Sequence, residues 1–152
     1  MSSYPMNQYA PSFFQGLDVA DPSQIGYEPR PFTYIYNPPN NQLTSLQEVV
    51  NDSVQIDVDS DFRLFAWYIA LFTGEFEIQI ADSTGYYLFS GFMNSGAISQ
   101  SSAVPTIFSP AHPFPAGGKI LININDLSVA TNPLQIAFVG EKLFQTTRAR
   151  RQ

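Results

Sequence analysis

Alternation of apolar and polar residues is the strongest pattern in this sequence, and it predicts β-strands. Val54 to Val58 places three aliphatic residues on one face, and later segments repeat this two-residue period. Phe62 to Thr73 is a long apolar run, compatible with a strand buried on both faces or with a short helix. Its aromatic residues and the Gly74 that ends it favour a strand. The predicted strands are 32–36, 54–58, 62–73, 76–80, 86–89, 106–108, 120–124 and 134–138.

The segments between these strands are turns and loops. Residues 91–118 are rich in Gly, Ser and Pro and indicate a loop around one short strand, and 43–50 is the one stretch that suggests a helical turn or two. About eight short strands with almost no helix predict an all-β fold, a β-sandwich or jelly roll. We place this sandwich domain at 32–144, between an N-terminal arm (1–31) and a C-terminal tail (145–152).

The N-terminal arm combines prolines with aromatic residues. Five prolines in 31 residues are too many for a helix or a central strand, and they favour an extended segment. A disordered linker, however, usually lacks aromatic residues. We therefore expect the arm to dock, either on its own domain or, as we favour, on a neighbouring subunit. The expected contact residues are Tyr4, Tyr9, Phe13, Phe14 and Tyr27.

The net charge of −6 is unevenly distributed. Residues 1–147 contain four basic residues against all thirteen acidic ones, whereas the remaining three basic residues are Arg148, Arg150 and Arg151. An acidic body disfavours a broad nucleic-acid surface, which requires clustered Lys and Arg. We expect the basic tail to bind carboxylates of a neighbouring subunit, for which 57–61 of another copy is one candidate, with nucleic acid as the alternative.

Composition restricts the chemistry further. The chain has no Cys, so disulfides, thiolate metal sites and a Cys nucleophile are excluded. His112 is the only histidine, prolines surround it, and no G-x-S-x-G motif is present. We therefore predict no catalytic residues, no cofactor and no enzymatic activity. The chain lacks a run of about 20 apolar residues and the features of a signal peptide at its start, so we expect neither a membrane helix nor secretion by that route.

Asp57, Asp59 and Asp61 form a D-x-D-x-D pattern that resembles the start of a calcium loop. Hard cations prefer several oxygen ligands, so these carboxylates are weak metal candidates. The EF-hand spacing fails, because Phe62 occupies the position that needs Gly and Tyr68 the position that needs Glu. We favour a solvated strand end or a charge patch between subunits.

Five segments together resemble small β-sandwich virion proteins of tailed bacteriophages. They cover much of the chain after residue 53: Asp57–Phe62, Gly74–Asp82, Pro113–Gly118, Ile122–Ser128 and Leu134–Phe144. The resemblance implies a non-enzymatic part of the phage particle, assembled in the host cytoplasm. Its partners would be the major capsid protein or other virion subunits, and further copies of itself as a homo-oligomer.

Within this class a capsid decoration (cement) protein is our first hypothesis, and a collar, neck or tail component is the second. In the first, sandwich bodies and aromatic arms bury apolar surface against neighbouring shell subunits. A different class, a carbohydrate-binding sandwich that recognises a host surface, stays open because exposed aromatic residues suit sugars as well. Particle stability with and without the protein separates the first hypothesis from the last.

Overall fold

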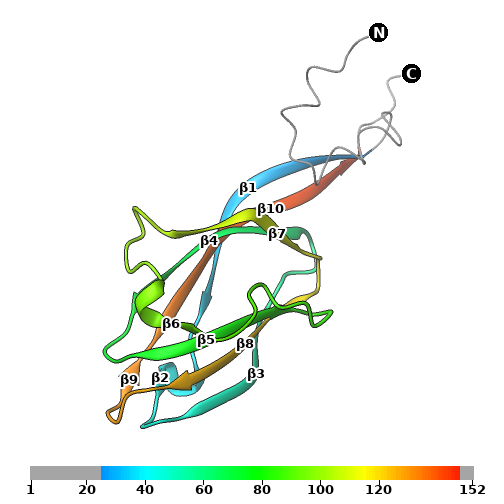
Figure 1. The fold of residues 1–152 in the computed structure, drawn as a ribbon. Coiled ribbons are helices and arrows are strands. Elements are labelled where there is room, and N and C mark those ends of the chain that lie inside the picture. Colours follow the sequence, from blue (N-terminus) through cyan, green and yellow to red (C-terminus); the bar gives the residue numbers. More distant parts are fainter. Residues whose placement is uncertain (1–24, 148–152) are drawn as a thin grey trace, which may run out of the picture.

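The computed structural model describes residues 25–147, which form two four-stranded antiparallel sheets that face each other (Figure 1). The first sheet has the order β1 (Ile25–Tyr36), β10 (Gln135–Thr147), β4 (Asp61–Leu71) and β7 (Thr106–Phe114). The second has the order β3 (Glu48–Gln55), β8 (Lys119–Asp126), β5 (Phe76–Asp82) and β6 (Met93–Asn94). A small sheet pairs β2 (Gln42–Leu43) with β9 (Asn132–Pro133), and two 3-10 turns complete the elements, η2 (Pro39–Asn41) and η3 (Ser95–Ala97). The predicted all-β sandwich is confirmed.

The core lies between the two sheets, where the alternating residues of both meet. Ile120, Ile122 and Ile124 of β8 are fully buried, and they face the inner side of the first sheet. The long apolar run forms β4, a central strand with β10 on one side and β7 on the other. Its bulky side chains Phe62 and Trp67 are buried in the core. Trp67 is 1% exposed and is one of the largest side chains of the core.

β10 requires a glycine at position 140, where it pairs with β4. A register shift between Val139 and Gly140 marks a β-bulge, and the ring of Phe62 packs against Gly140. A Cβ atom at position 140 would overlap this ring and the Arg63 carbonyl oxygen. The absence of a side chain at Gly140 therefore lets two central strands of the first sheet approach closely.

Several local predictions are wrong. The predicted strand 86–89 is a loop in which Tyr87 makes one isolated bridge with Ala81, and the predicted strand 54–58 ends at Gln55, where β3 ends. Residues 43–50 form no helical turn: Leu43 belongs to β2, Val49 belongs to β3, and a turn separates them at Leu46, which has a φ of 53°. Both Leu43 and Val49 are buried, and anchoring them in two different sheets overrides the weak helical tendency. The loop expected at 91–118 contains a nine-residue strand, β7, instead of three strand residues.

The strand boundaries at both ends also differ from the expected ones. β1 begins at Ile25, so residues 25–31 pair with β10, and β10 continues to Thr147. Pro29 and Pro31 are tolerated because β1 is an edge strand. The pairing of β10 with β4 ends at Leu143, so beyond it β1 and β10 project as a two-stranded ribbon (Figure 1).

Most expected contact residues of the two ends lie outside the described residues. These are Tyr4, Tyr9, Phe13, Phe14, Arg148, Arg150 and Arg151. Tyr27 is within them and pairs with Gln145 in the ribbon. Between residues 25 and 147, no helix is long and apolar enough to cross a membrane.

Candidate functional site

The outer face of the first sheet is largely apolar where its four strands pair. Tyr34, Phe138 and Trp67 lie side by side and face the core, so the residues next to them along each strand face outward. The register aligns two such outward rows: Thr33, Val139, Ala66 and Ile107 in one, and Ile35, Ala137 and Tyr68 in the other. Ile107 is 63% exposed and Ile35 is 44% exposed, whereas Ala66 and Ala137 are buried. We call these seven residues the apolar face.

One ion pair borders the apolar face. Glu141 of β10 is opposite Arg63 of β4, and their side chains form a salt bridge in which both are less than one-fifth exposed. The pair carries no net charge, because each side chain neutralises the other. Because both side chains are already largely removed from water, covering this border costs less desolvation free energy than covering fully exposed charges would.

The outer face of the second sheet is polar. Glu77 of β5 pairs with Asn125 of β8, whose side-chain amide donates a 2.9 Å hydrogen bond to the Glu77 carboxylate. In the next row, the Asn123 side-chain oxygen accepts a 2.8 Å hydrogen bond from the Asn51 backbone N–H. Gln79 completes that row. This face resembles the solvated side of an ordinary antiparallel sheet.

Tyrosine hydroxyls close one lateral side of the sandwich. The Tyr36 hydroxyl of β1 donates a 2.9 Å hydrogen bond to Asp52 of β3, and the Tyr34 hydroxyl donates a 3.2 Å bond to Asp57. Burial and the Asp52 carboxylate both raise the pKa of Tyr36 far above its ordinary value. Ionisation of these phenols therefore opposes the closed arrangement.

Lys142 joins the same side of the sandwich. Its ammonium group lies 2.5 Å from the Asp57 carboxylate and 3.6 Å from that of Asp59, and it sits 4.2 Å above the centroid of the Phe32 ring. Burial would lower the pKa of Lys142, but the hydrogen bond to Asp57 together with nearby negative charge, that of Asp57 and Asp59 included, outweighs burial and raises this pKa. The same hydrogen bond lowers the pKa of Asp57.

The three aspartates of the D-x-D-x-D pattern do not converge. Asp57 and Asp59 face Lys142, whereas Asp61 accepts a 2.9 Å hydrogen bond from the backbone N–H of Ala116. Among residues 25–147, no three carboxylate or imidazole groups are placed to share a metal ion. The sequence could not reveal Lys142 as the partner, because 85 positions separate it from Asp57.

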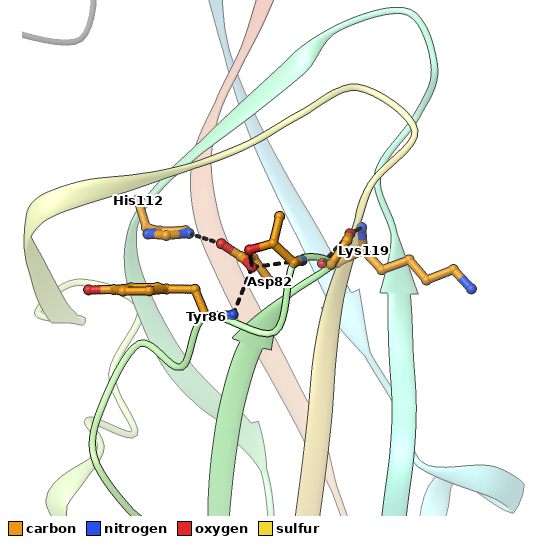
Figure 2. Close-up of polar contacts among 6 residues, drawn as sticks. Asp82, Tyr86, His112 and Lys119 are labelled. Carbon is orange, nitrogen blue, oxygen red and sulfur yellow. Dashed lines mark hydrogen bonds and ion pairs between the residues drawn. The ribbon is translucent and has the colours of Figure 1, made fainter.

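A carboxylate–imidazole pair closes the opposite lateral side. His112 Nε2 of β7 lies 3.1 Å from Asp82 Oδ2 at the end of β5, so the pair connects the two sheets (Figure 2). The ring of Tyr86 is parallel to the imidazole, with an interplanar angle of 2° and a centroid distance of 5.6 Å. Phe114 contacts the imidazole edge-on from 4.9 Å.

Asp82 also organises the turn that follows it. Asp82 Oδ1 accepts hydrogen bonds from the Thr84 backbone N–H at 2.9 Å, from the Thr84 hydroxyl at 2.5 Å and from the Tyr86 backbone N–H at 3.1 Å. Burial would raise the pKa of Asp82, but these bonds and the one to His112 together lower it. Asp82 therefore stays ionised and fixes the position of Tyr86.

Sequence reasoning missed this cluster. We expected Asp82 in a simple turn and His112 in a rigid loop, but β7 extends through His112 and pairs it with Leu64. The Asp-x-Thr spacing signals the local turn. Nothing in the sequence indicates the imidazole, which is 30 positions away.

Searches against protein-family models, curated proteins and solved structures each gave no match.

Proposed function

We propose that this chain is a non-enzymatic structural protein of a tailed-phage particle, a capsid decoration (cement) protein that stabilises the shell through contacts between subunits. The resemblance of five segments to phage virion sandwiches supports the particle assignment. The apolar face supports the contact role, and it is the observation that carries the proposal. A collar, neck or tail component would use the same face and remains the alternative position.

The apolar face is suited to burial against a flat partner. Burial of one aliphatic side chain contributes about 1.5–3 kcal/mol before ordering costs are subtracted. Ile107 and Ile35 are both exposed and lie on opposite edge strands of the face, so a partner that covers them covers the whole sheet. Burial of these two isoleucines therefore contributes more than an exposed salt bridge, which contributes about 0–1 kcal/mol.

Contact through the sheet face is favoured over contact through a strand edge. β1 and β7 are the edge strands of the first sheet, and both contain prolines: Pro29 and Pro31 in β1, Pro110 and Pro113 in β7. Proline cannot donate the backbone hydrogen bond that strand addition needs. We therefore expect the partner to lie across the sheet and not beside it.

Particle stability tests the proposal. Phage particles that lack the protein are heated, with and without added purified protein, and release of packaged DNA is followed by dye fluorescence. We expect the added protein to restore a higher release temperature. Unchanged release temperatures, or absence of the protein from purified particles by mass spectrometry, would refute the decoration role.

A further inference from the structure

A small pocket lies beside the Asp82–His112–Tyr86 cluster. It has a volume of about 180 Å³ and is open to solvent, between β7 and the segment that follows β5. Its lining residues are Tyr86, Leu88, Phe108, Ser109, Pro110, Ala111 and His112. Binding pockets for drug-sized ligands measure about 300–1,000 Å³, so this one suits a single ring.

The aromatic wall of the pocket is held in place before any ligand binds. Tyr86 is 63% exposed, yet its backbone is fixed on both sides by Asp82: one carboxylate oxygen accepts from the Tyr86 N–H, and the Tyr86 carbonyl accepts from the Asp82 N–H at 2.9 Å. His112 is held by Asp82 and by the edge of Phe114. An exposed ring on a fixed backbone loses little conformational entropy on binding.

The charges near the pocket are already paired or point elsewhere. Asp82 uses one carboxylate oxygen for three donors and the other for His112. The side chain of Lys119 extends away from the two rings (Figure 2). Because the chain is also acidic overall, with a net charge of −6, a phosphate-bearing ligand is disfavoured and an uncharged one is favoured.

The remaining groups define the ligand further. Two aromatic residues, Tyr86 and Phe108, line the pocket together with the polar residues Ser109 and His112. A pyranose matches this combination, because its C–H face packs on an aromatic ring while its hydroxyls bond to polar groups at the rim. We propose that this pocket binds a neutral hexopyranose, such as one unit of a surface glycan.

This inference does not depend on the decoration role, since the pocket and the apolar face involve different residues. The test uses the full chain and the methyl glycosides of glucose, galactose, mannose and N-acetylglucosamine, with adenosine as a flat aromatic comparator. Ligand-observed NMR detects binding, and amide shifts of the labelled protein locate it. We expect at least one glycoside to bind with a Kd of about 1 mM and to shift the amides of Tyr86 and of 109–112.

Three variants test the location. We expect Tyr86→Ala to weaken binding at least about tenfold, and Ala111→Trp, which fills the pocket, to do the same. Tyr87→Ala is the matched control: Tyr87 is the adjacent tyrosine, 51% exposed and not part of the lining, so its loss should change the Kd less than about twofold. Absence of glycoside binding up to about 10 mM would overturn the proposal, as would glycoside binding unaffected by both pocket variants, or adenosine binding alone.

Discussion

The two sheets share one core but have different outer faces. The second sheet presents Glu77, Gln79, Asn123 and Asn125 outward, and some of these side chains bond to one another. The first sheet presents rows of apolar residues with a single neutralised ion pair at their border. Core packing cannot explain this difference, because both faces point away from the core. The contrast therefore concerns what lies outside the domain.

An exposed apolar face lowers solubility unless something covers it. The polar face shows that this fold tolerates a solvated outer surface, so the apolar one is a property of the sequence and not of the architecture. The following predictions separate the fold from the face. They run from the largest expected effect on the free energy of unfolding to the smallest.

Gly140→Ala should have the largest effect, because it disrupts the first sheet itself. The new Cβ would overlap the Arg63 carbonyl oxygen and the Phe62 ring, so β10 and β4 must separate. We expect a loss of about 3 kcal/mol or more in chemical denaturation. Gly91→Ala is the control, because its added Cβ meets nothing within 4 Å. Equal stability of the two variants would contradict the close approach of the strands.

Asp82→Ala should cause the second largest loss in the free energy of unfolding, because it removes one lateral connection between the sheets. Both outer faces stay intact in this variant. Three donors and His112 lose their acceptor, and we expect a loss of about 2–3 kcal/mol at pH 7. The pKa of Asp82 is lowered in the folded state, so its contribution is present above the unfolded value of about 3.9 and is lost as the pH falls below it. Denaturation between neutral and acidic pH should show this acid-dependent loss in the wild type and a smaller one in the variant.

Tyr36→Phe should have a smaller effect of about 1 kcal/mol, because it removes one hydrogen bond of the opposite lateral side. The pKa of Tyr36 is raised in the folded state, so its contribution is present below the unfolded value of about 10 and declines as the pH rises above it. The wild type should therefore lose more stability than the variant when the pH is raised past this value. Tyr87→Phe, at an exposed tyrosine, should behave like the wild type; an identical alkaline loss in all three proteins would argue against the role of Tyr36.

The sequence predicts the core well and the surfaces poorly. Alternation shows which residues of a strand share a face, and in the predicted strand 120–124 the residues Ile120, Ile122 and Ile124 do share the buried face. It does not show which strands are neighbours. The apolar face combines residues of β1, β10, β4 and β7, and only the sheet order brings these strands together.

The polar clusters escaped prediction for the same reason. His112 and Asp82 come from different sheets, and Lys142 reaches Asp57 across 85 positions. Pairings over such distances depend on topology, whereas the local Asp82–Thr84 turn follows from the sequence alone. The two prolines of residues 25–31 suggest an arm outside the sheet, because proline is excluded from central strands. The sequence does not show that β1 is an edge strand, where proline is tolerated.

Ile107→Glu should have the smallest effect on folding and the most direct effect on the proposed role. Ile107 is 63% exposed, so a glutamate there should change the free energy of unfolding by less than about 0.5 kcal/mol. Val50→Glu is the matched control, because Val50 is also β-branched, is 65% exposed and lies in β3 of the other sheet.

The decisive measurement is cosedimentation of each purified variant with phage particles that lack the protein. A partner that covers the apolar face must bury the carboxylate that the Ile107→Glu substitution introduces, without an opposite charge to pair with it. We therefore expect Ile107→Glu to weaken binding at least about a hundredfold and Val50→Glu to change it less than about threefold. Equal binding of both variants, or a greater loss for Val50→Glu, would contradict the claim that the first sheet contacts the particle.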